Sequence, residues 1–408
     1  MKSINNTYKC SGKVSQVRKS SSRAFKAVSR GCENSFKPFR TVSACAGSCL
    51  HGCGLVLRQA MCPQFLLAKK KSLSQERLRS VSLCFLAAVF MLSMVAGAKV
   101  SAQAVPGPDE NIQFLVTFGK DALTSWGDNN FRQIFFFSIP KDYTQQFYIR
   151  VFDPDCGGRH DETQGEFDSR TMFSVYGGTG ADPEQHDESQ GLDNGLNYKT
   201  GNLLASRVFG VDPAYDNNYY SFGPFTATEG EFNEQWNSYI FKFICEGVSG
   251  DDGNLYRYFL SRNTSANLPI EGANAFTYEY TFRMWNDPKS VAHIYPYINE
   301  GIVSIRQSNF DWDNDGKILV VSRYKRGVEV PISNEDDWAV STIPIESAEI
   351  NSSLDFQFHK RPETIRNNNV VIRLQNQRGD ALKFYSSPIG GVPVYIPRTT
   401  ITKIPPSK

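Results

Sequence analysis

The stretch FRQIFFFSIP, residues Phe131–Pro140, combines four phenylalanines and two isoleucines and ends at a proline. The next run, QFYIRVFDPD at Gln146–Asp155, alternates between apolar and polar residues and ends in a turn sequence. Further along, NSYIFKFICEG at Asn237–Gly247 places its aromatic residues and a cysteine on one face. A two-residue period of β-branched and aromatic residues, interrupted by Asp, Asn, Gly and Pro, indicates short β-strands. The sequence after Ala104 has no long helical period, so it predicts an all-β protein.

A change in the strand pattern near Asn286–Pro288 predicts a domain boundary. Six or seven short strand-like runs follow it within about 110 residues, a number and spacing typical of an immunoglobulin-like sandwich, although the disulfide of that fold is absent. We therefore expect two consecutive β-sandwich domains, a jelly-roll-like one at residues 105–287 and an Ig-like one at 288–390. The proline-rich residues 391–408 are expected to form an extended tail.

The net charge of +2 is the sum of two unlike segments. Residues 1–104 contain 17 Lys and Arg and two acids, whereas residues 105–408 contain 27 Lys and Arg and 40 Asp and Glu. The net negative charge of the second segment disfavours binding to nucleic acid, because such binding requires basic residues that neutralise the phosphates.

The boundary between these segments has the order of a secretory signal peptide. Basic residues precede the uncharged run at 80–98, and Ala102-Gln103-Ala104 supplies an A-x-A cleavage site. We expect residues 80–104 to be a signal peptide cleaved after Ala104, which implies a secreted, periplasmic or cell-surface protein. The alternative is an uncleaved segment 80–98 that anchors the chain in a membrane. Residues 1–79 are expected to be a basic, disordered leader, or the result of a start codon placed too early, with Met61 as the true start.

Only two of the nine cysteines, Cys156 and Cys245, follow Ala104. In an oxidising compartment a pair of cysteines favours a disulfide, so we predict one between them. The alternative is a pair of free thiols.

Two acidic loops are candidate calcium sites, because calcium prefers hard oxygen ligands and adjacent carboxylates repel one another without a cation. The first loop carries Asp153, Asp155, Asp161, Glu162 and Asp168. A solvated acidic loop is the alternative explanation for it.

The second loop, DWDNDG, carries Asp311, Asp313 and Asp315 at the spacing of an EF-hand. Ser322 stands where an EF-hand needs a bidentate glutamate, and the flanking sequences predict strands rather than helices. This loop is therefore predicted to be either a calcium-binding turn or a plain hairpin turn.

Trp126 and Trp312 fall in predicted loops, where an indole can stack on a sugar ring; packing over the end of the core is the alternative. The sequence contains no nucleophile elbow, Walker loop or dinucleotide-binding glycine motif. Paired carboxylates for glycoside hydrolysis remain open, because acidic residues are abundant.

The sequences FFFSIPKDYTQQFYIRVFDPDCGG and SGDDGNLYRYFLSRN resemble β-sandwich modules of secreted or envelope proteins of Gram-negative bacteria, in the style of pre-peptidase and carbohydrate-binding sandwiches. The resemblance implies a binding, adhesive or structural role toward a glycan or an envelope protein, and it supplies no catalytic residue. We thus expect a non-catalytic module with calcium-stabilised loops. The alternative function is that of a carbohydrate-active enzyme that uses carboxylates of the acidic loops.

Overall fold

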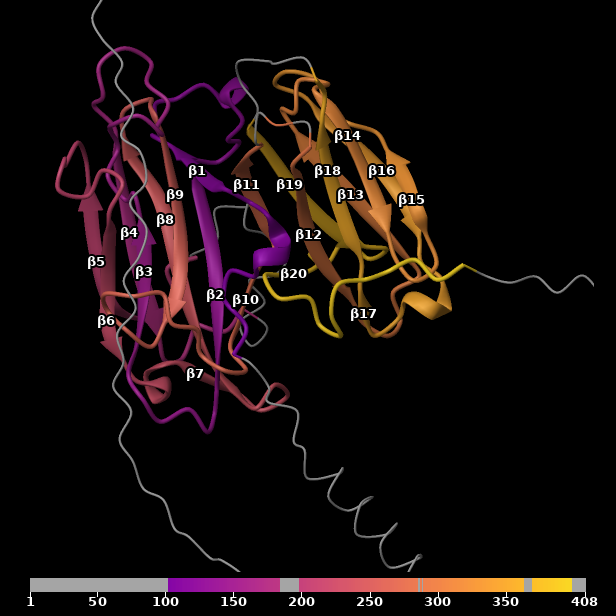
Figure 1. The fold of residues 1–408 in the computed structure, drawn as a ribbon, viewed down its shortest axis with the longest axis horizontal. Helices are drawn as coiled ribbons and strands as arrows, with labels where there is room; N and C mark the ends of the chain where they lie inside the picture. Colours follow the sequence, from indigo (N-terminus) through magenta and orange to yellow (C-terminus); the bar gives the residue numbers. More distant parts are fainter. Residues whose placement is uncertain (1–101, 184–197, 285–286, 288, 363–368, 398–408) are drawn as a thin grey trace, which may run out of the picture. The chain divides into compact units, whose positions relative to one another are not determined.

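The computed structural model describes residues 102–183, 198–284, 287, 289–362 and 369–397. The predicted leader, signal peptide and hydrophobic segment lie outside these ranges, apart from the last residues before the cleavage site. The described residues form an all-β fold, as predicted (Figure 1). Their helical turns are short and of the 3₁₀ type: η1 (Pro108–Glu110), η2 (Thr124–Trp126), η4 (Ala227–Glu229) and η5 (Ser347–Glu349).

The first sheet contains eight strands: β1 (Phe114–Phe118), β3 (Phe147–Phe152), β6 (Tyr219–Phe225), β9 (Gly253–Ser261), β11 (Glu279–Arg283), β13 (Ser304–Phe310), β16 (Trp338–Pro344) and β19 (Asn369–Asn376). They lie in the order β16-β13-β19-β11-β1-β9-β3-β6, and every neighbouring pair is antiparallel.

The second sheet has twelve strands: β2 (Arg132–Pro140), β4 (Arg170–Gly177), β5 (Asn202–Phe209), β7 (Glu231–Asn233), β8 (Ser238–Ser249), β10 (Asn274–Thr277), β12 (Val291–Ile298), β14 (Gly316–Val321), β15 (Arg326–Val330), β17 (Ser352–Ser353), β18 (Asp355–Lys360) and β20 (Phe384–Tyr385). Ten of them follow the order β15-β14-β18-β12-β20-β10-β2-β8-β4-β5, while β17 pairs with β12 and β7 pairs with β8.

Both sheets run through the predicted domain boundary at residue 287. In the first sheet, β11 pairs with β19 over five residues, from Glu279 opposite Arg373 to Arg283 opposite Asn369. In the second sheet, β20 lies between β10 and β12 and pairs with both. The division into two consecutive sandwiches is therefore not confirmed, because each sheet contains strands from both sides of the boundary.

The main hydrophobic core lies between the two sheets. The ring of Phe135 in β2 packs on that of Tyr258 in β9, with centroids 4.9 Å apart, and Phe282 in β11 meets Phe358 in β18 at 5.2 Å. In FRQIFFFSIP, Phe135 and the other apolar residues on the same face of the strand therefore point into this core. Ile134 and Phe136 point the other way, into a second cluster that covers the outer side of β2 and β8. Burial on both faces explains why this run is almost continuously apolar.

Candidate metal centre

Asp153 and Asp155 lie in the turn that follows β3. Asp153 has a left-handed backbone (φ 57°), which lets the chain leave the strand sharply. Both residues are buried, with 0% and 1% of their surface exposed. Oδ1 of Asp153 accepts a hydrogen bond from the Asn217 amide at 2.7 Å, and Oδ2 of Asp155 accepts one from the Asp212 amide at 3.3 Å.

The other oxygen of each carboxylate, Oδ2 of Asp153 and Oδ1 of Asp155, is buried and has no hydrogen-bond partner. Leaving a buried carboxylate oxygen without a donor is costly, so such atoms need an explanation. Burial raises the pKa of Asp153, and it raises the pKa of Asp155 to about 6, with repulsion from Asp153 contributing to the second shift.

Asp161 completes the group from the same loop. Its Oδ2 accepts from the Gly157 amide and its Oδ1 from the Leu255 amide, both at 2.6 Å. Burial raises its pKa well above the usual range, and Asp153 and Asp155 raise it further by repulsion. The structure thus places three of the five acids predicted for this loop within electrostatic range of one another, although their carboxylate oxygens do not all lie within 4.8 Å of one another.

Asp216 also faces this group, and we did not predict it. Its charge raises the pKa of both Asp153 and Asp155, behind the larger effect of burial. A Cβ atom at Gly158 would lie 2.3 Å from Oδ1 of Asp216, so the glycine leaves room for this carboxylate. Asp216 belongs to the turn sequence YDNN, which lies 55 residues beyond Asp161 in the chain, so the sequence alone did not connect it with the first loop.

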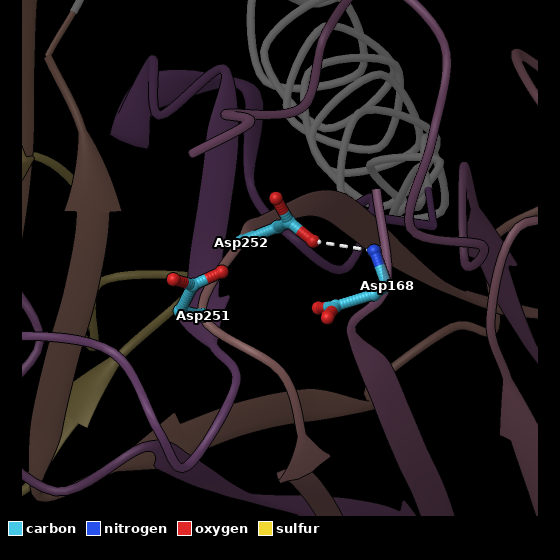
Figure 2. A group of neighbouring side chains, drawn as sticks. All are labelled: Asp168, Asp251 and Asp252. Atoms are coloured by element: carbon cyan, nitrogen blue, oxygen red, sulfur yellow. Dashed lines mark hydrogen bonds between the residues drawn. The ribbon is translucent and has the colours of Figure 1, made fainter. Parts of the chain in front are cut away.

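The other two acids of the predicted set have different partners. Glu162 forms an ion pair with Arg283 and accepts a hydrogen bond from Nδ2 of Asn369 at 3.1 Å. Asp168 joins Asp251 and Asp252 in a second acidic group, whose potential ligand atoms lie within 4.8 Å of one another (Figure 2).

The oxygens of this second group lie closer together than those of the first group, but none of them is a buried atom without a partner. The carboxylate of Asp252 accepts hydrogen bonds from the backbone amides of Gln164, Asp168 and Ser169 at 2.9–3.1 Å. Although burial acts in the opposite direction, these bonds hold the pKa of Asp252 below its usual value. Asp252 therefore already has donors that organise the loop, and Asp168 is exposed to solvent.

In the DWDNDG loop the positive partner is a lysine. Asp315 forms an ion pair with Lys360, and both side chains are buried. Oδ1 of Asp311 accepts from the Asp336 amide. Burial raises the pKa of Asp311 to about 7 and that of Asp313 to about 6. Oδ2 of Asp311 and Oδ1 of Asp315 are buried without a partner, as in the first loop, but here Lys360 already supplies a positive charge. We therefore place the proposed ion in the first loop, and the calcium site at Asp311, Asp313 and Asp315 stays a prediction.

The two tryptophans differ from each other. Trp312 is fully buried and packs on Phe358, with ring centroids 5.3 Å apart, so it cannot stack on a sugar. The prediction of a ligand site at Trp312 is wrong, and the alternative of core packing is correct. Trp126 in η2 is half-buried against Phe118 at 5.9 Å and retains a partly accessible ring.

The predicted disulfide is not formed. Cys156 and Cys245 are both free thiols, and both are buried. Cys245 in β8 points into the main core, where Tyr256 is its hydrogen-bonding neighbour. Cys156 lies in the turn after β3, among the acids of the candidate metal centre. Burial raises the pKa of both thiols, which disfavours the reactive thiolate form.

A cavity of about 320 Å³ opens beside η1 and β9. Among its lining residues only Glu110 carries a carboxyl group. Both of its oxygens already accept hydrogen bonds, from the Tyr280 hydroxyl at 2.7 Å and the Ser386 hydroxyl at 3.1 Å. The paired carboxylates that glycoside hydrolysis requires are therefore not found among the residues that line this cavity.

Comparison with known proteins gives no relative: no protein-family model matches the chain, and no curated protein matches it significantly. In the part of the chain that the structure describes, no helix is long and apolar enough to cross a membrane.

Proposed function

We propose that the chain is a non-catalytic binding or structural module of the cell envelope or the extracellular space, with a calcium ion in the loop after β3. One observation carries the calcium site: Asp153 and Asp155 each keep a buried carboxylate oxygen without a partner, beside Asp161. A cation there would neutralise the group and supply the missing interaction.

The donor set favours calcium over a transition metal. Asp153, Asp155, Asp161 and Asp216 offer only oxygen ligands, which suit hard cations. Calcium accepts six to eight oxygens in flexible geometry, so backbone carbonyls and waters can complete the shell. The cysteine closest to the group, Cys156, has its pKa raised by burial and by the acids, and a protonated thiol is a poor ligand.

The non-catalytic part of the proposal is supported by the state of the carboxylates. The carboxylates of Glu110 in the cavity and of Asp252 already accept hydrogen bonds within the fold. A loop organised by calcium instead provides a rigid acidic surface for a partner, for which a glycan or another envelope protein is the proposed class.

Thermal melting of the protein in calcium and in EDTA tests the site. A ligand that binds only the folded state at 100 times its Kd stabilises it by about 2.7 kcal/mol. We expect calcium to raise the melting temperature of the wild type by several degrees and to have no effect on Asp153→Asn with Asp155→Asn. In EDTA this double variant should be more stable than the wild type, because two buried charges are removed.

The matched control is Asp168→Asn with Asp251→Asn, which removes two charges from the other acidic group. It should keep the full response to calcium. An equal calcium response in both double variants would place the ion elsewhere, and no response in the wild type would refute the calcium site.

A further inference from the structure

Asp315 and Lys360 are neighbours on adjacent strands. Asp315 immediately precedes β14, and Lys360 is the last residue of β18, opposite Gly316 in the ladder. The amide of Arg361 donates to the carbonyl of Asp315 at 2.9 Å, which fixes the two chain segments against each other. The side chains meet in the interior, with 1% of the lysine side chain and 0% of the aspartate side chain exposed.

As an ion pair, these two side chains have few hydrogen-bond partners besides each other. Oδ1 of Asp315 is buried and has no partner. Among the described residues, Asp315 is the only hydrogen-bond acceptor for Nζ of Lys360, although an ammonium group has three donors. A buried charge pair is stable only when further hydrogen bonds satisfy the donors and acceptors that the two ions do not use with each other.

Two other buried lysines, Lys242 and Lys325, have more hydrogen bonds around them than Lys360 has. Nζ of Lys242 donates to the carbonyls of Gly180, Tyr198 and Thr200 and to the Thr200 hydroxyl, over 2.7–3.3 Å. Nζ of Lys325, like that of Lys360, has one acceptor among the described residues, the carboxylate of Glu349. That carboxylate also accepts from the Ser322 hydroxyl and the Glu346 amide, so both of its oxygens have partners. Within the described parts of the chain, no such network surrounds the Asp315–Lys360 pair.

An amide would suit this site better than two charges, because it has one donor and one acceptor in place of an ammonium and a carboxylate. Apolar rings also lie beside the pair. The indole of Trp312 is buried against Gly316, where an added Cβ would lie 2.7 Å from the ring, and it packs on Phe358.

A further carboxylate, that of Asp313, lies within electrostatic range of the pair. Asp313 interacts electrostatically with both Asp315 and Lys360. Burial and repulsion from Glu335 raise its pKa to about 6, so it can accept and return a proton near neutral pH.

We propose that Nζ of Lys360 and the side-chain carboxyl of Asp315 join in an intramolecular amide bond. A proton first passes from the ammonium to the carboxylate, which leaves a neutral amine and a neutral acid. Nζ then attacks Cγ of Asp315, and a C–N bond forms. Asp313 takes a proton from Nζ and returns it to the departing hydroxyl, the C–O bond breaks, and one water leaves. No oxidant, reductant or cofactor is needed, and the step is independent of the calcium site.

Tryptic peptide mapping of the full chain, denatured and reduced, tests the bond. The amide would join the peptides 307–317 and 327–366 into one branched peptide, because trypsin cannot cut at a modified Lys360 or between Arg361 and Pro362. Its mass should be about 18 Da, one water, below the sum of the two peptides. Lys360→Arg and Asp315→Ala should each give linear peptides only. Linear peptides of full mass from the wild type would overturn the proposal.

Lys325 supplies the internal control, because its carboxylate partner is already satisfied. Cleavage after Lys325 should therefore be complete in the same digest. Asp313→Ala should lower the branched fraction at least several-fold at equal time after synthesis. An unchanged fraction would overturn the role of Asp313 while leaving the bond in place.

Discussion

Oε1 of Gln133 in β2 accepts a hydrogen bond from the backbone amide of Thr281 in β11, 3.0 Å away on the opposite sheet. Its Nε2 donates to the carbonyl of Val116 in β1 at 2.9 Å. Strands β1 and β11 pair directly at Leu115 and Phe282. At the next position, between Val116 and Thr281, the side-chain amide of Gln133 bridges the two strands in place of a direct backbone hydrogen bond. A polar side chain within the core thus joins the sheets and completes one of them.

Replacing Gln133 by Leu should leave the amide of Thr281 and the carbonyl of Val116 buried without partners. Each such group costs about 1–3 kcal/mol, so we expect a loss of about 2–5 kcal/mol in the free energy of unfolding. Urea denaturation measures it. Gln145→Leu, at an exposed position, is the control and should change stability by less than about 0.5 kcal/mol. Equal stability of the two variants would contradict the bridging role.

Glu110 should make stability depend on pH. Burial raises its pKa to about 8, against the opposing effect of hydrogen bonds from Tyr280 and Ser386. Its pKa in the unfolded chain is about 4.3, so the folded state binds the proton more tightly and stability falls as pH rises from about 4 to about 8.

Glu110→Gln keeps the shape of the protonated acid and cannot ionise. Its urea midpoint should match that of the wild type near pH ~4 and exceed it near pH ~9. Glu234→Gln, at an exposed site, should follow the wild type throughout. A constant difference between Glu110→Gln and the wild type at all pH values would show that the pKa of Glu110 is the same in the folded and unfolded states.

Calcium and protons should compete at Asp155. Its folded pKa of about 6 lies above the unfolded value, so without metal this group destabilises the fold as pH rises toward 6. A metal requires the ionised carboxylate. The rise in melting temperature on adding calcium should therefore be small near pH ~5 and larger near pH ~8. A rise that is independent of pH would argue against a carboxylate site with raised pKa values.

The proposed amide should stabilise the fold by restricting the unfolded chain. It closes a loop of about 45 residues, for which the chain-entropy relation gives about 4 kcal/mol. Lys360→Arg keeps the positive charge and removes the bond, so its free energy of unfolding should fall by about this amount. Lys325→Arg, at the satisfied ion pair, is the matched control and should lose much less.

Local patterns predicted the strands well but not their long-range pairing. The alternation in Phe131–Pro140 identifies β2, and nothing in it reveals that β11 pairs with β19, some ninety residues further along the chain. The acids of the first loop were identified by their density, whereas Asp216 reaches them only through the fold. Trp312 was misjudged because its aspartate neighbours suggested exposure, while the turn actually folds the indole inward.

The continuity of the two sheets across residue 287 has a thermodynamic consequence. If the two halves were separate domains, each could melt alone, and a calorimetric scan would resolve two steps. Here the separation of one half from the other would break the β11–β19 ladder and leave β10 and β12 without β20. The halves should therefore unfold together, in one cooperative transition whose calorimetric and van't Hoff enthalpies agree.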